Sequence, residues 1–315
     1  MKWGIISTGR IAKQFCHDLS RVEGAELYGV AARKHEDAVA FKDEFKVQHA
    51  FETYEDLFAN PDIDIVYIGT PHTLHFEQSL GALSKGKHVL CEKPATINTE
   101  QMLALSTVAR DKKCVFMEAM WTYFLPAIEQ AKQWVEIGRI GRIKHIKADF
   151  GYPIAYSPTL REYDPSLGGG CLYEMGIYPL AISHYFLGSD LTNIHLRRQK
   201  APNGVESDVV LTAQLNGAII SLATSFQCKL QNWAYIIGED GYIAIPDFWR
   251  AKSCYLYQLD EKIDEFVEER DTFGFEHEAM AMQDVVTSGM LESQVMPHST
   301  SIWLQATMER LKKLF

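Results

Sequence analysis

The sequence has few cysteines, no long apolar run and no excess of positive charge. Its six cysteines form no CxxC pair, and most of them stand in apolar segments, which excludes a disulfide scaffold and favours a reducing compartment. No stretch stays apolar over the ~20 residues that cross a bilayer, and the run after Met1 is shorter than a signal peptide. We therefore expect a cytoplasmic protein with no membrane partner.

Basic residues are outnumbered by acidic ones. There are 31 Lys and Arg residues against 41 Asp and Glu residues, which leaves a formal net charge of -10 at pH 7. A protein that grips phosphate backbones carries the opposite sign, so no nucleic acid is expected as a partner, and a small-molecule substrate is. At 315 residues, 47% of them hydrophobic, the chain is long enough for about two domains with cores of their own.

The first 118 residues alternate short apolar runs with helical periodicity. After an apolar run at 3–7, Ile11, Phe15 and Leu19 recur every four residues and share one helix face. Further strands are expected at 27–32, 65–69, 89–91 and 115–117, with helices at 36–45, 74–84 and 99–110. Such alternation is typical of a doubly wound parallel sheet, so we predict an α/β domain over residues 1–118.

The alternating segments become longer in the rest of the chain. Strands are expected at 143–150, 194–198, 209–215, 218–226 and 233–245, with helices at 127–137, 277–286 and 302–314. Asn216-Gly217 separates two of these strands and indicates a tight hairpin. We therefore predict that residues 119–315 form an α+β domain with an open, mostly antiparallel sheet. Packing of the C-terminal helix back on the first domain is the alternative left open.

A glycine-containing turn joins the first predicted strand to the first predicted helix. Its residues are Ser7, Thr8, Gly9, Arg10 and Ile11. At such a turn, backbone N–H groups and the helix dipole can hold a diphosphate. The dinucleotide pattern GxGxxG would have glycine where Ser7 and Ala12 stand, and only Gly9 keeps the close-approach position. The turn predicts a dinucleotide site, with an ordinary strand–helix turn as the alternative.

Two basic residues follow the second predicted strand. Arg33 and Lys34 stand where a carboxylate would accept hydrogen bonds from the ribose hydroxyls of NAD. An arginine there offers a planar fork for a 2′-phosphate. The charge favours NADP over NAD as the cofactor, and the alternative is a solvated pair at the start of a helix.

Polar residues also follow the strands predicted at 65–69 and 89–91. They are Thr70, Pro71, His72 and His75 in one turn, and Glu92 and Lys93 in the other. Ligands of open α/β sheets bind beyond the carboxyl ends of the strands, so both turns are predicted to contact the cofactor. Pro94 disfavours helical continuation and holds Lys93 in place. The alternative for each histidine is a capping or packing role, and no metal site is expected.

Three consecutive glycines precede the most informative helix of the second domain. Gly168, Gly169 and Gly170 let the backbone pass close to another group. In the following helix Glu174 and Tyr178 are four residues apart and are expected on one face. A carboxylate and a phenol buried together are costly unless they are paired or used in chemistry. The alternative is a glycine-rich bend before an ordinary surface helix.

Taken together, these motifs resemble the Gfo/Idh/MocA family of NAD(P)-dependent oxidoreductases, and within it the dimeric dihydrodiol dehydrogenase group. The segments that carry the resemblance are ISTGRIA, AAR, GTPHTLH, VLCEKPATIN, FMEAMWTYFLPA and GGGCLYEMGIY. The resemblance spans essentially the whole chain and implies a Rossmann domain, an open-faced α/β domain, a substrate cleft between them and a catalytic lysine, Lys93. It also implies a homodimer, which we expect to form through the open sheet face.

The chain departs from the family pattern at three positions. Many relatives carry Asp and His where this sequence has Glu174 and Tyr178. The dihydrodiol dehydrogenase group has tyrosine at the last position, so the resemblance assigns the acid/base role to Tyr178. That group has Asp where Glu174 stands and Arg where Tyr123 stands, which puts a substrate or cofactor contact in doubt.

The resemblance implies a reversible hydride transfer between C4 of the nicotinamide and a secondary alcohol carbon or its ketone. A free phenol has a pKa of about 10 and ionises poorly at neutral pH. Lys93, as a neighbouring cation, is expected to stabilise the phenolate of Tyr178, which exchanges a proton with the substrate oxygen. Glu174 is expected to orient Lys93 or to hold a substrate hydroxyl.

Aromatic residues near the expected cleft favour a ring-shaped substrate. Trp121 and Phe150 are the expected contacts, together with Tyr178. The resemblance allows arene trans-dihydrodiols, aldoses and dicarbonyls. Two other functions stay open: an NAD-dependent glycoside hydrolase of the same superfamily, against which Arg33 argues, and a non-catalytic NADP-sensing module, against which Lys93 and Tyr178 argue.

Overall fold

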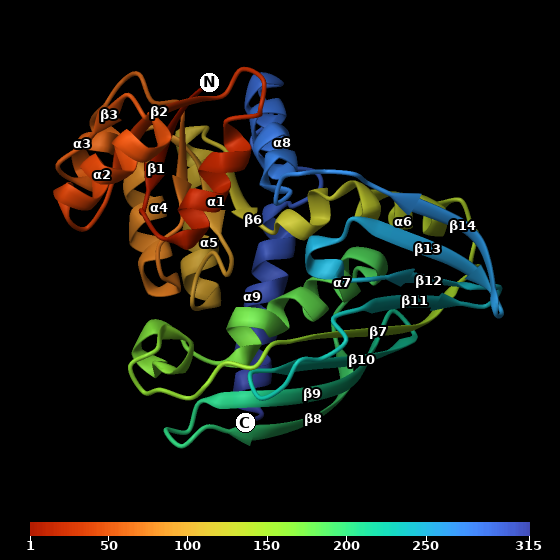
Figure 1. Ribbon diagram of the computed structural model, residues 1–315. Coiled ribbons are helices and arrows are strands. Elements are labelled where there is room, and N and C mark those ends of the chain that lie inside the picture. Colours follow the sequence, from red (N-terminus) through yellow and green to blue (C-terminus); the bar gives the residue numbers. More distant parts are fainter. The chain divides into compact units, whose positions relative to one another are not determined.

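The computed structural model describes residues 1–315, shown as a ribbon in Figure 1. The chain divides into two compact units. The first unit comprises Met1–Trp121 and Asp271–Gln305, and the second comprises Thr122–Arg270 and Ala306–Phe315. The first unit is thus made of two segments of the chain, and Asp271–Gln305, which precedes the last ten residues of the second unit, belongs to it.

A six-stranded parallel sheet forms the frame of the first unit. Its strands are β1 (Lys2–Ile6), β2 (Glu26–Ala31), β3 (His49–Ala50), β4 (Ile65–Ile68), β5 (His88–Glu92) and β6 (Phe116–Ala119). They lie in the order β3-β2-β1-β4-β5-β6, with every neighbouring pair parallel. All four residues of β4 are buried, as expected for a strand covered on both faces. The predicted doubly wound sheet is confirmed, and its order switches between β1 and β4, where such sheets bind ligands.

Five helices connect these strands. They are α1 (Arg10–Leu19), α2 (His35–Phe45), α3 (Tyr54–Ala59), α4 (His75–Ser84) and α5 (Thr99–Lys112). The start of α5 is set by Asn98, whose side-chain oxygen accepts a hydrogen bond from the N–H of Gln101 at 2.9 Å. The sequence pattern did not indicate α3 or β3, because a helix of six residues and a strand of two are too short to show a period.

A buried aspartate explains why α8 (Phe275–Thr287) belongs to the first unit. Asp18 of α1 is fully buried, and one of its carboxylate oxygens accepts hydrogen bonds from the N–H groups of Gly274 and Phe275 at 2.9 and 3.0 Å. Gly274 is the N-cap of α8 and has no side chain to supply an acceptor. Further along the helix, Gln283 accepts a hydrogen bond from the Trp3 indole at 3.3 Å. These contacts are made between residues far apart in the sequence.

An eight-stranded mixed sheet forms the frame of the second unit. Its strands are β7 (Ile143–Gly151), β8 (Thr192–Lys200), β9 (Glu206–Leu215), β10 (Ala218–Ser225), β11 (Ala234–Gly238), β12 (Tyr242–Ile245), β13 (Ser253–Gln258) and β14 (Glu261–Val267). Only β7 and β10 pair in parallel; the other neighbours are antiparallel, as predicted. Asn216 and Gly217, with φ of 48° and 77°, make the predicted hairpin turn between β9 and β10. The strands β13 and β14 were not expected.

Helices cover one face of this sheet and leave the other open. Helix α6 (Pro126–Glu136) packs on β12, β13 and β14, and α7 (Ile177–Leu187) packs on β7 and β10. Val210 and Ile219, on β9 and β10, are 46% and 44% exposed, while their neighbours Leu211 and Ile220 are buried. Helix α9 (His298–Lys313) belongs to the first unit up to Gln305 and to the second unit after it.

None of the helices combines the length and the apolar composition that crossing a bilayer requires. All six cysteines are free thiols, and only Cys228 is exposed.

Candidate active site

The turn between β1 and α1 leaves the start of that helix without a side-chain cap. Gly9 is the N-cap residue, and no acidic residue stands in the first turn of α1. The N–H of Gly9 donates to the Ser7 hydroxyl at 3.1 Å, and Ser7 itself has a φ of 119°. A Cβ on Gly9 would meet only that hydroxyl, at 3.3 Å, so the glycine is not required by packing within the protein. Uncapped helical N–H groups and open space before them fit a dinucleotide diphosphate.

Arg33 and Lys34 are both exposed after the carboxyl end of β2. Lys34 is the N-cap of α2 and makes no side-chain cap bond. Burial raises the pKa of the Tyr54 phenol, and the positive charge of Arg33 partly offsets that rise, which places the guanidinium near Tyr54. Two cations are therefore available at this strand end.

His75 links the turn after β4 to the turn after β5. Its side chain is fully buried, with Nδ1 2.8 Å from the carbonyl oxygen of Pro94 and Nε2 2.7 Å from that of Thr70. The hydroxyl of Thr70 in turn donates to Gln78 at 2.6 Å. His75 thus faces the protein's own carbonyls and holds the two predicted turns together, which matches the packing alternative for this residue. His72 is also buried, and its predicted contact with the cofactor, like those of Thr70 and Pro71, stays a prediction.

The carboxylate of Glu92 shapes the turn that carries Lys93. One oxygen of Glu92 accepts a hydrogen bond from the Tyr67 hydroxyl at 2.8 Å, and the other accepts the N–H of Lys93 at 3.2 Å. Glu92 is 8% exposed, whereas Lys93 is half-buried. Glu92, the last residue of β5, therefore holds the backbone of Lys93 in place.

A second buried carboxylate, Glu118 of β6, lies beneath the same turn. It accepts a hydrogen bond from the N–H of Ala95 at 2.9 Å and a further one from the Ser301 hydroxyl. Burial raises the pKa of Glu118 to about 7, although these hydrogen bonds and the positive charge of Lys93 oppose the rise. The sequence indicates this role only by placing one acidic residue inside a short apolar strand.

In the second unit, two of the three consecutive glycines, Gly169 and Gly170, pass close to protein atoms. A Cβ on Gly169 would come within 2.8 Å of the Asp164 backbone. Gly170 has a φ of 128°, and a Cβ there would overlap the carboxylate of Glu206. The predicted close approach is therefore made to this chain itself, and it fixes where the next helix begins.

The helix after the glycines starts with a π turn, Leu172–Gly176, which continues directly into α7. Glu174 lies in the π turn and Tyr178 in the first turn of α7. A π turn closes its hydrogen bonds over five residues, so the step from Glu174 to Tyr178 is not that of a regular α-helix, and their expected placement on one face stays a prediction. Such turns recur at functional sites.

Arg161 and Glu174 form a two-point ion pair. The two guanidinium nitrogens donate to the two carboxylate oxygens, each at 2.9 Å. The neighbouring negative charge of Glu174 and its hydrogen bond raise the pKa of Arg161 against the opposing effect of burial, which is the largest single influence. Arg161 lies in an irregular segment 13 residues before Glu174 and carried no sequence pattern that pointed to this role.

Tyr178 lies in an aromatic cluster. Its ring meets Phe150 edge to face, with centroids 5.3 Å apart, and lies 6.2 Å from Trp249. Phe150 and Trp249 stack on each other at 4.9 Å and 24°. The structure therefore brings two predicted residues, Phe150 and Tyr178, together with Trp249, which stands between strands in the sequence and was missed.

Trp121 and Tyr123 pack within separate units. Trp121, an expected substrate contact, is 5% exposed and stacks on Phe275 in the first unit at 4.4 Å. The hydroxyl of Tyr123 donates to the carbonyl of Ala181 at 2.6 Å, and its ring packs on Tyr185 at 4.5 Å. Tyrosine at position 123 thus contributes to the core of the second unit.

The sequence matches two family models in succession. Residues 1–120 match the model described as "Oxidoreductase family, NAD-binding Rossmann fold", and residues 128–244 match "GFO/IDH/MocA C-terminal domain". The chain is 32% identical to a trans-1,2-dihydrobenzene-1,2-diol dehydrogenase from Xenopus laevis, over 98% of this chain and 96% of that protein. This chain belongs to the Gfo/Idh/MocA family of oxidoreductases. Its first unit is an NAD(P)-binding Rossmann domain.

Solved structures of other oxidoreductases share the fold of this family member. KijD10, a 3-ketoreductase from Actinomadura kijaniata in complex with NADP and TDP-benzene, has a TM-score of 0.87 at 24% identity over 99% of this chain and 97% of its own. Levoglucosan dehydrogenase in complex with NADH and levoglucosan has a TM-score of 0.90 at 18% identity over 99% and 96%. One neighbour holds NADP and the other NADH, so the shared fold does not decide between the two cofactors.

Replacing Glu118 with glutamine should change how stability depends on pH. Because burial raises the pKa of Glu118 from 4.5 to about 7, the folded protein binds more protons than the unfolded chain between these values, and stability falls as pH rises through this window. Glutamine keeps an acceptor for the N–H of Ala95 and removes the titration. As pH rises from ~5 to ~8, wild type should lose up to roughly 3 kcal/mol of its free energy of unfolding relative to Glu118→Gln. Urea unfolding at several pH values measures this difference.

The matched control is Glu77→Gln, which changes an exposed carboxylate of the same unit and should leave the pH dependence of stability as in wild type. Equal pH slopes for wild type and Glu118→Gln would contradict the assignment of a protonated Glu118.

Proposed function

We propose that this protein is an NADP-dependent dehydrogenase or reductase that acts on a secondary alcohol or ketone of a cyclic diol or sugar. The observation that carries the proposal is a buried phenol, Tyr178, at 6% exposure, set against the stacked rings of Phe150 and Trp249 in a chain whose other unit is an NAD(P)-binding domain. Phenols of this kind can exchange a proton with a substrate oxygen.

The residues that would hold the cofactor are the turn Ser7 to Ile11 and the two strand-end turns joined by His75. When bound, the dinucleotide supplies the hydride donor or acceptor at C4 of its nicotinamide. Arg33 and Lys34 support NADP, because exposed cations at this strand end suit a 2′-phosphate and no carboxylate stands in their place. Glu36 and Asp37 in the first turn of α2 oppose that preference in part.

In the proposed reaction Tyr178 donates a proton to the substrate oxygen during reduction and removes one during oxidation. Lys93 is proposed to stabilise the phenolate, since a neighbouring cation favours the charged form. Glu174 is held by Arg161, so its proposed role is to fix that guanidinium and the segment before the glycines. Arg161 then becomes a candidate to hold a substrate hydroxyl.

The aromatic cluster supports a flat or ring-shaped substrate. Phe150 is 5% exposed, and its stack with Trp249 forms a rigid apolar surface next to Tyr178. Apolar ring faces pack on such surfaces, and the C–H face of a sugar does so too. The dehydrogenases similar to this chain that are named for a dihydrobenzene diol and for levoglucosan act on substrates of this chemical class.

We also propose a homodimer that forms through the open face of the eight-stranded sheet. Val210 and Ile219 expose apolar surface there, and apolar sheet faces of monomeric proteins are normally covered.

Removing the hydroxyl of Tyr178 tests the acid/base assignment. Tyr178→Phe keeps the ring packing against Phe150, so the fold should stand and kcat should fall about 100-fold or more in a coupled assay of NADP+ reduction with dihydrodiols and aldoses. The control is Tyr163→Phe, which removes a hydroxyl that donates to the carbonyl of Ile154 at 2.7 Å and should leave kcat near wild type. Near-normal turnover by Tyr178→Phe would refute the assignment.

The cofactor preference is tested by Arg33→Ala. Loss of a charged hydrogen bond to the 2′-phosphate costs about 1.5–3 kcal/mol, so the ratio of kcat/KM for NADP+ over NAD+ should fall by about 10- to 100-fold. Arg142→Ala, which removes an exposed arginine of the second unit, should leave that ratio unchanged. A wild-type enzyme that prefers NAD+ would overturn the proposal.

The proposed dimer should dissociate when charged side chains are introduced on the open face of the sheet. Wild type should elute at twice the 35.8 kDa of the chain in size-exclusion chromatography with light scattering. The double variant Val210→Glu/Ile219→Glu should elute as a monomer, because an interface does not bury unpaired charges without a large cost. A monomeric wild type would exclude this assembly.

A further inference from the structure

An ion pair of a buried carboxylate and a partly exposed lysine lies at the start of the helix that carries Glu174 and Tyr178. Glu206 is the first residue of β9, and Lys312 lies in the last turn of α9. The Lys312 Nζ is 3.7 Å from a carboxylate oxygen of Glu206, and the two side chains are only 28% and 7% exposed. Both residues belong to the second unit.

The carboxylate of Glu206 contacts the backbone where the helix begins. It lies directly against Gly170, where a Cβ would overlap it, and it accepts a hydrogen bond from the N–H of Leu172. Cys171, the residue before the π turn, supplies no side-chain cap. Glu206 therefore acts as the cap of this helix from another strand, at the end where the helix dipole favours negative charge.

Lys312 contacts the same segment through a ring. Its Nζ lies over the face of Tyr173, 3.7 Å from the ring centroid, which is a close cation–π contact. Tyr173 is the neighbour of Glu174 in the π turn. Lys312 thus contacts both Glu206, which caps the helix, and Tyr173, which lies in the first turn of that helix.

Burial opposes the charge of both partners, and each partner favours the charge of the other. Burial raises the pKa of Glu206, which the Lys312 ammonium opposes. Burial lowers the pKa of Lys312, which the Glu206 carboxylate opposes. The desolvation of two charges cancels much of their attraction, so a pair of this kind adds little to stability, whereas its contacts can hold neighbouring segments together.

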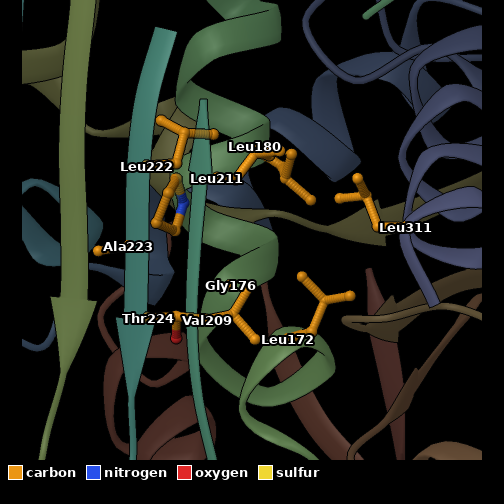
Figure 2. Close-up of a pocket in the computed structure, with 10 residues that line it drawn as sticks. Leu172, Gly176, Leu180, Val209, Leu211, Leu222, Ala223, Thr224 and Leu311 are labelled. Atoms are coloured by element: carbon orange, nitrogen blue, oxygen red, sulfur yellow. The ribbon is translucent and has the colours of Figure 1, made fainter. Parts of the chain in front are cut away.

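Apolar side chains also surround the π turn. A small pocket lies between the turn, α7, the strands β9 and β10 and the end of α9, and Figure 2 shows its side chains around Gly176. Its lining includes Leu172, Leu180, Leu211, Leu222 and Leu311. Carbon contacts carry little directional preference, whereas the contacts to Glu206 and Lys312 join the turn to defined atoms.

We propose that Glu206 and Lys312 are positioning residues that hold the π turn Leu172–Gly176 in place and so direct Tyr178 toward the substrate and Glu174 toward Arg161. The proposal rests on the proposed function of Tyr178 as the proton donor. Misplacing a reacting group by about 1 Å can cost 100-fold in rate, so a weakened anchor should lower kcat before it affects folding.

The variants Glu206→Gln and Lys312→Met test this proposal. Glutamine keeps the volume and an acceptor for Leu172 but not the charge, and methionine keeps the apolar stem of the lysine without its ammonium. Each should lower kcat for alcohol oxidation about 10- to 100-fold and change substrate KM and NADPH affinity less than threefold. Lys312→Arg keeps the cation and should recover most of the rate. Glu239→Gln, which breaks a surface pair of the same unit, should have no effect.

A double-mutant cycle separates positioning from a general structural role. In the Tyr178→Phe background the group to be positioned no longer carries a proton, so adding Glu206→Gln should reduce kcat less than twofold further. A purely structural defect would reduce kcat by the same factor in both backgrounds and would lower NADPH affinity and melting temperature in parallel.

The outcomes also separate this proposal from the proposed function. Normal turnover by Tyr178→Phe refutes the function and the positioning proposal with it. If Tyr178→Phe is impaired but Glu206→Gln and Lys312→Met turn over as wild type, or if their losses add to that of Tyr178→Phe, only the positioning proposal is overturned. If Glu206→Gln does not fold, Lys312→Met and its arginine counterpart carry the same test.

Discussion

A buried carboxylate needs hydrogen-bond donors or a cation beside it. This requirement shapes the segments that carry the proposed reacting groups. In the first unit Glu118 accepts the N–H of Ala95 beneath the turn of Lys93. In the second unit Glu206 accepts the N–H of Leu172 at the start of the helix that carries Tyr178. Both acids are strand residues, so in each unit the sheet directly holds an irregular segment that would otherwise be free to shift.

The two units differ in the kind of atom that they offer a ligand. In the proposed site, the first unit would offer the cofactor the main-chain N–H groups and the helix end at the turn of Gly9, and these do not require a glycine at position 7. The second unit would offer a substrate side chains, namely the phenol of Tyr178 and the ring faces of Phe150 and Trp249. Substitutions in the second unit should therefore change the substrate more readily than the cofactor.

Local patterns in the sequence predicted what local interactions decide. The parallel sheet, the Asn98 cap and the hairpin at Asn216 follow from periodicity and turn chemistry within a few neighbouring residues. Long-range pairings left no such pattern: α8 joins the first unit through Asp18, 256 residues before Gly274. The π turn was also missed, because a single extra residue in one hydrogen-bonded ring does not alter the hydrophobic period of the helix that follows.

The central claim is that Lys93 and Tyr178 act on one substrate oxygen at one nicotinamide. The most direct test is a crystal structure of the protein with NADP+ and an alcohol substrate, in which the distance from the Tyr178 hydroxyl to the Lys93 Nζ is measured. The account predicts that the two atoms lie within hydrogen-bond reach of each other or of the same substrate oxygen, at about 3.5 Å or less. A bound substrate whose reacting carbon lies far from Tyr178, with Lys93 turned away, would contradict it.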